Sequence, residues 1–182
     1  MLAIAKQDDS SIEVRVHPVF ISEDSLLAKV DGVYNAVLVE GDLVGKVLFF
    51  GEGAGASATS SAVVANVVSA ARDIVLGVGS RVRWRLEPGK RIKSMSEIET
   101  RYYLRLNVAD RPGVLAQISK ILGDHLVSIA SVIQKEVDSL AQTAEIVIMT
   151  HPAKESAMQP ALRMLAHLDV VKEISNFIRV EA

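Results

Sequence analysis

The feature that most constrains the fold of this chain is residues 107–122, where the hydrophobic pattern changes abruptly from alternating to helical. Before this point apolar side chains alternate, as they do in a half-buried strand. After it they recur every three or four positions, as they do on one face of a helix. The two sets are Tyr102, Leu104, Leu106 and Val108, and then Val114, Leu115, Ile118, Ile121 and Leu122. The pattern predicts a tight strand-to-helix turn at residues 110–113.

The chemistry of this turn suits both a helix start and the capture of a small anion. Asp110 or a near neighbour can cap the helix, Pro112 fits a first turn because proline lacks an N–H, and Gly113 removes a side chain there. The amides of a helix start and the positive end of its dipole attract a carboxylate. The capping rules are satisfied without a ligand, so local physics alone favours a simple helix start.

The segments that follow complete a βαββαβ order. Strands are predicted at residues 127–133, 144–149 and 170–180, and a second helix is predicted at residues 155–168. This is the order of the split βαβ, or ferredoxin-like, arrangement, in which four antiparallel strands carry two helices on one face. The second half of the chain is therefore expected to be an α+β domain.

Residues 101–182 resemble the ACT domain, a small regulatory module that binds amino acids. The resemblance rests on Asp110-Arg-Pro-Gly-Val-Leu at the first strand-to-helix junction and on His125-Leu-Val-Ser-Ile-Ala-Ser at the entry to the second strand. Many ACT domains hold their effector with an Asn where this chain has Ser128. That position is a departure from the family pattern.

The resemblance also implies an effector site between two copies of the domain, and hence a homo-oligomer. One copy would contribute its helix start and the other its second strand. The expected effector is threonine, with isoleucine as a weaker candidate. The implied contacts are Asp110, Gly113, Val114 and Leu115 from one copy, and Ser128 and Ile129 from the other.

The composition excludes several classes of partner. The chain has 182 residues, of which 49% are hydrophobic, and a break near Gly77 favours two small cores over one large core. Its 20 basic and 22 acidic residues show no basic stripe and only 4% of residues are aromatic, so no nucleic-acid partner is expected. The absence of cysteine fits a reducing cytoplasm. No signal peptide is recognisable, and the apolar runs are too short to predict a membrane span.

The first half of the chain is predicted to be rich in strands. A hairpin is expected through polar residues 7–11, and a second hairpin about Gly41-Asp42, a dipeptide that can supply positive φ angles. The expected strands are residues 2–6, 12–21, 35–40 and 43–50, with a short helix over residues 22–30.

A glycine-rich stretch then precedes a long helix predicted at residues 59–76. Gly51, Gly53 and Gly55 allow close approach to a ligand, so a phosphate or a nicotinamide amide could lie at the helix start. A dinucleotide fingerprint, however, needs a second parallel strand that ends in an acidic residue, and here Asp73 lies inside the helix. By spacing alone, a glycine turn that packs closely on its helix is the preferred interpretation.

Three blocks in register resemble one family. They are Val16-His-Pro-Val-Phe-Ile, the run Asp31-Gly-Val-Tyr-Asn-Ala-Val-Leu-Val-Glu-Gly-Asp, and the glycine stretch Gly51 to Thr59 with the Ser and Ala-Val that follow. Together they are similar to the C-terminal portion of the catalytic region of homoserine dehydrogenase, whose bacterial members carry an ACT domain next. The implied division is residues 1–78 as this strand-rich remnant, 79–99 as a linker and 100–182 as the ACT domain.

Homoserine dehydrogenase interconverts L-homoserine and L-aspartate 4-semialdehyde with NADPH or NADH, on the route to threonine, methionine and isoleucine. In that family an N-terminal Rossmann domain holds the dinucleotide and a central segment supplies a catalytic lysine; this sequence has no counterpart to either. We therefore expect a truncated enzyme, natural or engineered, that is inactive alone and contains no catalytic residue. Neither NADP nor NAD is expected to bind the fragment by itself.

The resemblance assigns a few cofactor positions residue by residue. Gly55 matches a position that touches the nicotinamide end of the cofactor and lies near a structural sodium ion. Thr59 matches a position beside the same cofactor, and Gly53 shapes the loop. These residues would form one wall of a site, since the other wall belongs to the Rossmann domain.

Further expectations concern association and alternatives. The helix at residues 59–76 is apolar around much of its circumference, which favours a dimer or higher oligomer unless the two hairpins cover it. Trp84 is expected to pack at a contact, and the four histidines, His17, His125, His151 and His167, show no metal-site spacing. Two rival functions remain: a stand-alone, non-enzymatic ACT sensor of amino acids, and a nucleotide-binding protein that uses residues 51–59.

Overall fold

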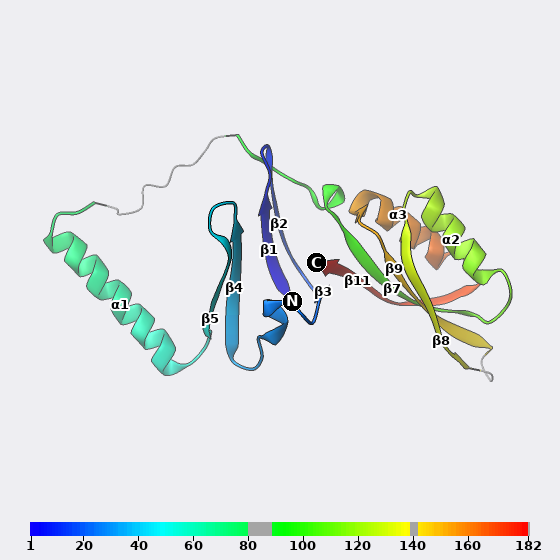
Figure 1. Ribbon diagram of the computed structural model, residues 1–182, viewed down its shortest axis with the longest axis horizontal. Coiled ribbons are helices and arrows are strands. Elements are labelled where there is room, and N and C mark those ends of the chain that lie inside the picture. Colours follow the sequence, from blue (N-terminus) through cyan, green and yellow to red (C-terminus); the bar gives the residue numbers. More distant parts are fainter. Residues whose placement is uncertain (80–88, 139–141, 182) are drawn as a thin grey trace. The chain divides into compact units, whose positions relative to one another are not determined.

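The computed structural model describes residues 1–79, 89–138 and 142–181, and within them strands alternate with three α-helices in an α+β architecture (Figure 1). These residues divide into two compact units. The first contains Met1–Ile21 and Pro88–Ala182, and the second contains Ser22–Glu87. The predicted linker is described only in part, and Trp84 lies outside the described residues.

The C-terminal part of the first unit has the predicted βαββαβ order. Its elements are β7 (Glu99–Ala109), α2 (Val114–Asp124), β8 (Ile129–Asp138), β9 (Thr143–Thr150), α3 (Glu155–Ala166) and β11 (Val171–Glu181). The strands lie in the order β11-β7-β9-β8 with every neighbouring pair antiparallel, and β10 (Ala153–Lys154) pairs with the start of β7. The ferredoxin-like prediction is therefore confirmed.

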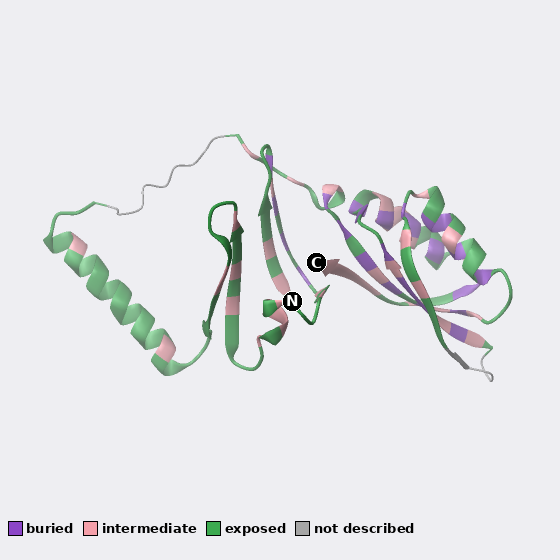
Figure 2. Cartoon of the chain, in the orientation of Figure 1, coloured by how far each residue is buried: buried purple, intermediate pink, exposed green. Residues whose placement is uncertain are grey.

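The core of this domain lies between the sheet and its two helices. Figure 2 shows buried residues along β7 and β9 and on the inner sides of α2 and α3. Alternation on β7 and helical spacing on α2 predicted much of this core, because each element presents one apolar face. The predicted residues that are buried are Tyr102, Leu104, Leu106, Val108, Val114, Ile118, Ile121 and Leu122. Leu115 is the exception, since its side chain is 43% exposed.

The first unit also contains strands from the beginning of the chain. β1 (Leu2–Gln7) and β2 (Ser11–His17) form the predicted antiparallel hairpin, and β6 (Arg91–Ile92) pairs with β2 in parallel. The single strand predicted at residues 12–21 is wrong, because Pro18 has no N–H for a sheet and separates β2 from β3 (Val19–Ile21). β3 instead pairs in parallel with β11 and widens the ACT sheet by one strand.

The second unit contains a hairpin and a long helix. A 3₁₀ turn (Leu26–Lys29) precedes β4 (Tyr34–Gly41), β5 (Gly45–Glu52) and α1 (Ala56–Val75). The hairpin was predicted, but its positive φ of 67° is at Gly45 and not in the Gly41-Asp42 dipeptide, because three residues separate the strands. α1 begins at Ala56, three residues before the predicted start, and none of its residues is buried. Among the described helices, none has the length and hydropathy needed to cross a bilayer.

Candidate functional site

The strand-to-helix turn after β7 is built around Gly113. This residue has φ 86° and is the N-cap of α2, which no side chain caps. The N-cap is thus a near neighbour of Asp110 and not Asp110 itself. The prediction that Pro112 lies in the first turn is wrong, because the left-handed Gly113 places the helix start at Val114. The amide of Asp110 donates to the carbonyl oxygen of Gln142 at 2.9 Å instead.

The surface at this helix start combines free amides with an exposed leucine. The first intrahelical hydrogen bond runs from the amide of Gln117 to the carbonyl of Gly113 at 3.2 Å. The amides of the first turn therefore have no partner within the helix. Leu115 is 43% exposed, whereas Val114 is 4% exposed and belongs to the core, so Val114 can offer a ligand only its backbone. The turn can attract a carboxylate and place an apolar side chain beside it.

The second group of predicted effector residues lies at the start of β8. Ser128 is exposed, and its carbonyl accepts the amide of His151 at 2.9 Å. Ile129 is half-buried against the core. Leu126, two residues before Ser128, has φ 60° and is 89% exposed, a feature that hydrophobic periodicity did not indicate. The prediction that Ser128 and Ile129 complete a site from a second copy stays a prediction.

The glycine-rich stretch forms the connection between β5 and α1. Gly53 donates its amide to the carbonyl of Val33 at 3.1 Å, and a Cβ at Gly53 would lie 1.2 Å from Nδ2 of Asn35. Gly55 has φ 141° and is the N-cap of α1, and its carbonyl accepts the amide of Thr59 at 3.0 Å. Packing therefore requires glycine at position 53 and the backbone favours glycine at position 55. The close packing was predicted to be on the following helix, whereas the atoms nearest to a Cβ at Gly53 belong to Asn35 on β4.

The same loop can be tested for its fit to the implied cofactor and ion. Thr59 is exposed in the first turn of α1, beside the carbonyl of Gly55. That carbonyl keeps a second lone pair, and a carboxylate oxygen of Glu52 lies 4.0 Å from the Cβ position of Gly55. Oxygen ligands of this kind suit a hard cation such as sodium. Within the described ranges, no group of three His, Cys, Asp or Glu residues could hold a metal ion.

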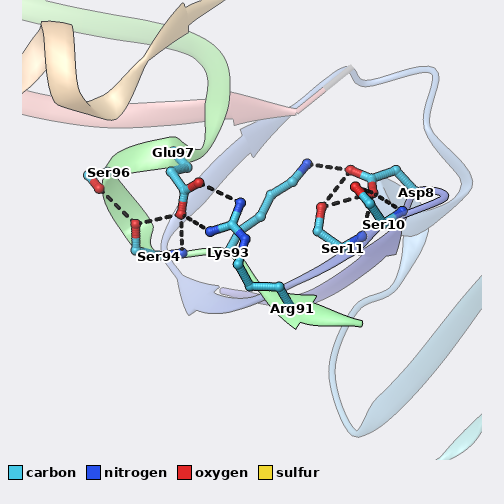
Figure 3. Close-up of polar contacts among 8 residues, drawn as sticks. All are labelled: Asp8, Ser10, Ser11, Arg91, Lys93, Ser94, Ser96 and Glu97. Atoms are coloured by element: carbon cyan, nitrogen blue, oxygen red, sulfur yellow. Dashed lines mark hydrogen bonds and ion pairs between the residues drawn. The ribbon is translucent and has the colours of Figure 1, made fainter. Parts of the chain in front are cut away.

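An exposed polar network joins the β1–β2 turn to the segment around β6 (Figure 3). One carboxylate oxygen of Asp8 accepts the amides of Ser10 and Ser11 at 2.9 and 2.6 Å, and the other lies 2.8 Å from Nζ of Lys93. The hydrogen bond from Lys93, followed by those from Ser11 and Ser10, holds the pKa of Asp8 well below its usual range.

The same network contains a capping box at Met95–Glu97. Arg91 donates two hydrogen bonds of 2.7 Å to the carboxylate of Glu97, which also accepts the amide of Ser94 at 2.9 Å. These contacts, with the bonds from Arg91 as the largest cause, lower the pKa of Glu97 to about 2. The Ser-x-x-Glu spacing is a known helix-start signal and was visible in the sequence.

A polar cavity of about 530 Å³ lies next to this network, within the first unit. It lies between β1 and β2 on one side and the start of α3 on the other. Its lining residues are Lys6, Glu13, Lys93, Ser96, Glu97, Glu99, Lys154 and Ser156. None of the residues predicted for the effector or cofactor sites lines it.

A buried hydrogen-bond network lies where α3 meets the sheet. Glu155 is 4% exposed and accepts hydrogen bonds from Tyr102 Oη and Arg179 Nε, both at 2.9 Å, and from Gln159 at 2.7 Å. Burial raises the pKa of Glu155, but the bonds from Arg179, Gln159 and Tyr102 outweigh it and keep the pKa below its usual range. Burial and this carboxylate raise the pKa of Tyr102 well above its usual range. Sequence pattern did not indicate this network, because Tyr102 and Arg179 lie 53 and 24 residues away from Glu155.

Comparison with known proteins gives one result for both halves of the chain. The homoserine dehydrogenase family profile matches residues 1–68, and the ACT domain profile matches residues 102–164. The homoserine dehydrogenase of Neisseria gonorrhoeae is 42% identical over 187 residues, which cover 100% of this chain and 43% of the relative. That of Helicobacter pylori is 40% identical over 184 residues, which cover 100% of this chain and 42% of the relative.

A solved structure gives the same result in three dimensions. A crystal structure of a homoserine dehydrogenase from Thiobacillus denitrificans matches with a TM-score of 0.87 and 39% identity, over 98% of this chain and 41% of that chain. The chain thus spans less than half the length of the relatives that it matches. It belongs to the homoserine dehydrogenase family, in which it corresponds to a C-terminal portion made of the end of the catalytic region and an ACT domain.

Proposed function

We propose that this chain is the regulatory C-terminal part of a homoserine dehydrogenase, and that its ACT domain binds threonine at the start of α2. The observation that carries the proposal is the Gly113 turn within a domain of the ACT family. Free amides at the helix start suit the carboxylate of an amino acid, and the exposed part of Leu115 suits a small apolar side chain. Ser128 and Ile129 of a second copy would close the site.

Association of two ACT domains is part of this proposal. β8 lies at the edge of the sheet, so its outer backbone groups are available to pair with another strand. Ile133 on this strand is 55% exposed. Pairing through this edge would bring a second copy next to the first, as an effector site between copies requires.

We propose the catalytic activity for a full-length homoserine dehydrogenase, like the relatives that this chain matches, and not for this chain alone. That activity is the NAD(P)-dependent interconversion of L-homoserine and L-aspartate 4-semialdehyde, in which the nicotinamide carries the hydride. Gly53, Gly55 and Thr59 would form one wall around the nicotinamide end, and the Gly55 carbonyl would be one ligand of a sodium ion. The close packing of Gly53 against Asn35 keeps this loop in a fixed shape. A cytoplasmic location agrees with the absence of cysteine and is proposed with the function.

A thermal melt of the purified chain against a panel of amino acids tests the effector proposal. A ligand at about 100 times its Kd that binds only the folded state adds about 2.7 kcal/mol of stability, which a melt detects easily. L-threonine is expected to raise the Tm, and D-threonine is expected to have no effect.

Two matched variants locate the site. Leu115→Glu places a negative charge at the helix start, where it favours the helix but repels a carboxylate ligand, so the threonine shift should disappear. Met164→Glu adds the same charge at a 49% exposed position on α3 and should leave the shift unchanged. A threonine shift that survives in Leu115→Glu would contradict this location of the site.

A further inference from the structure

Strand β2 buries its polar face. Val14 and Val16 are 57% and 66% exposed, although they are the most hydrophobic residues of their part of the strand. The alternate positions face inward, and they are Ser11, Glu13, Arg15 and His17, none more than 8% exposed. Burial of polar groups costs free energy unless they form hydrogen bonds or ion pairs. The contacts of these residues therefore indicate which segments of the fold β2 interacts with.

Arg15 is the centre of this buried face. Its side chain is 1% exposed, and its Nη2 forms an ion pair with Glu181 at the end of β11. Nε lies 2.7 Å from Oε1 of Glu13, an ion pair by distance although the angle is not that of a hydrogen bond. Nη1 lies 3.3 Å from Nε2 of His17, whose Nδ1 lies 2.9 Å from the carbonyl of Pro18. The guanidinium therefore fixes three side chains, of which Glu181 lies 166 residues away.

Strand β11, which contains Glu181, also contacts the ACT core. Glu181 also accepts a hydrogen bond of 2.7 Å from Lys6, and β3 pairs with the last three residues of β11. Two residues earlier on β11, Arg179 pairs with Glu155 at the start of α3. Tyr102 on β7 donates a hydrogen bond to the same carboxylate of Glu155. Strand β11 thus carries two ion pairs, one from Glu181 to Arg15 on β2 and one from Arg179 to Glu155 on α3.

We propose that Arg15 couples the homoserine dehydrogenase strands β2 and β3 to the ACT domain, so that a change in the ACT sheet on effector binding is passed to these strands through Glu181. This inference rests on the proposed amino-acid sensing and names the contact through which effector binding would act on β2 and β3. An effector can act on a distant segment only if the two segments share a two-state element. In this proposal that element is the buried ion pair between Arg15, in the β1-β2-β6 sheet, and Glu181, in the ACT sheet. Arg15 is a positioning residue in this role and touches no ligand.

Hydrogen exchange of the full chain, measured with and without L-threonine, tests the coupling. In the wild type, threonine is expected to slow exchange both in α2 and in residues 11–21. Arg15→Met keeps the length of the side chain but leaves Glu181 with Lys6 alone. In this variant residues 11–21 should exchange at least about tenfold faster and no longer respond to threonine, while α2 still responds.

Two further variants separate the coupling from a general loss of stability. Arg105→Met removes the cation of an exposed pair with Glu145 on the same domain, and it should keep the wild-type response in residues 11–21. Glu181→Gln retains hydrogen-bonding atoms and should reproduce the lost response with a milder loss of protection. Unchanged exchange of α2 shows that the ACT domain of each variant is folded.

The outcomes distinguish this proposal from the proposed function. If threonine slows exchange in α2 but residues 11–21 of the wild type do not respond, the coupling is wrong and the sensing stands. A full response of residues 11–21 in Arg15→Met also overturns the coupling. If threonine affects neither segment, the effector proposal fails. In that case the exchange of residues 11–21 without ligand is compared between Arg15→Met and the wild type. Equal exchange in the two proteins refutes the role of Arg15.

Discussion

At the scale of single residues, the glycines of this chain have different physical roles. Gly113 has φ 86° but open space around its Cβ position, so only the backbone conformation favours glycine there. At Gly53 the reason is the side chain of Asn35, which occupies the space of a Cβ. Gly123 lies in α2 with neither constraint, and nothing lies within 4 Å of its Cβ position. The same residue type thus marks a helix start, a close approach and an ordinary helical position.

Substitution of Gly113, the N-cap of α2, and of Gly123, within α2, tests this distinction. Gly113→Ala should lower the free energy of unfolding by about 1 kcal/mol, because a left-handed backbone is strained for an L-residue. Gly123→Ala should raise it by about 0.5–1 kcal/mol, since alanine is the better helix former. Urea unfolding measures both, and threonine binding should weaken only in Gly113→Ala. Equal effects of the two substitutions would show that φ at Gly113 carries no strain.

At the scale of elements, α1 exposes apolar side chains that a stable helix normally buries. Val63, Val64, Val67 and Val68 are 55–62% exposed, and no residue of the helix is buried. Of the two hairpins that were expected to cover this helix as an alternative, the β4–β5 hairpin of the same unit leaves it exposed. A surface of this kind favours association with another apolar surface, because each Å² of apolar area that is removed from water contributes about 25 cal/mol of stability.

A charge in the valine face of α1 should reduce self-association of the chain. Val67→Lys introduces a cation that would have to be desolvated in any apolar contact, which opposes association. Ser60→Lys adds the same charge to the same helix outside the valine set and serves as the control. Sedimentation velocity is expected to show a smaller average mass for Val67→Lys than for Ser60→Lys. Identical distributions for the two variants would exclude α1 from the associating surface.

At the scale of the whole molecule, carboxylates with lowered pKa values tie the stability of the first compact unit to pH. Asp8 and Glu97 are held ionised by Lys93 and Arg91 respectively, and the pKa of Glu181 is also lowered. For Glu181, burial raises the pKa, but Lys6 and Arg15 together outweigh it. A lowered pKa in the folded state means that the unfolded chain binds protons first as the pH falls.

The first unit should therefore lose stability in acid. The contribution of Glu97 is fully present above its unfolded pKa near 4.5 and is lost as the pH falls toward about 2. A series of thermal melts from pH 7 to pH 3 should show a falling Tm, and Glu97→Gln should make the fall shallower. A Tm that is independent of pH in this window would contradict the sign of these pKa changes.

The sequence by itself determined the βαββαβ order and the family. The switch in periodicity at residues 107–122 is local, and each predicted ACT element presents one apolar face, so hydrophobic spacing was sufficient. Three short motifs indicated the family. Local packing restricts the residue types in such motifs, as Asn35 does at Gly53.

Only the tertiary structure decided how the beginning of the chain meets its end. Nothing in local spacing indicates that β3 pairs with β11 or that Arg15 meets Glu181, because these partners are about 160 residues apart. Hydrophobicity alone would also turn Val14 and Val16 inward, whereas β2 buries the opposite face. A strand can bury a charged face only where its charged groups form ion pairs. For β2 the partner comes from a segment far away in the sequence, so only the folded structure shows which face is buried.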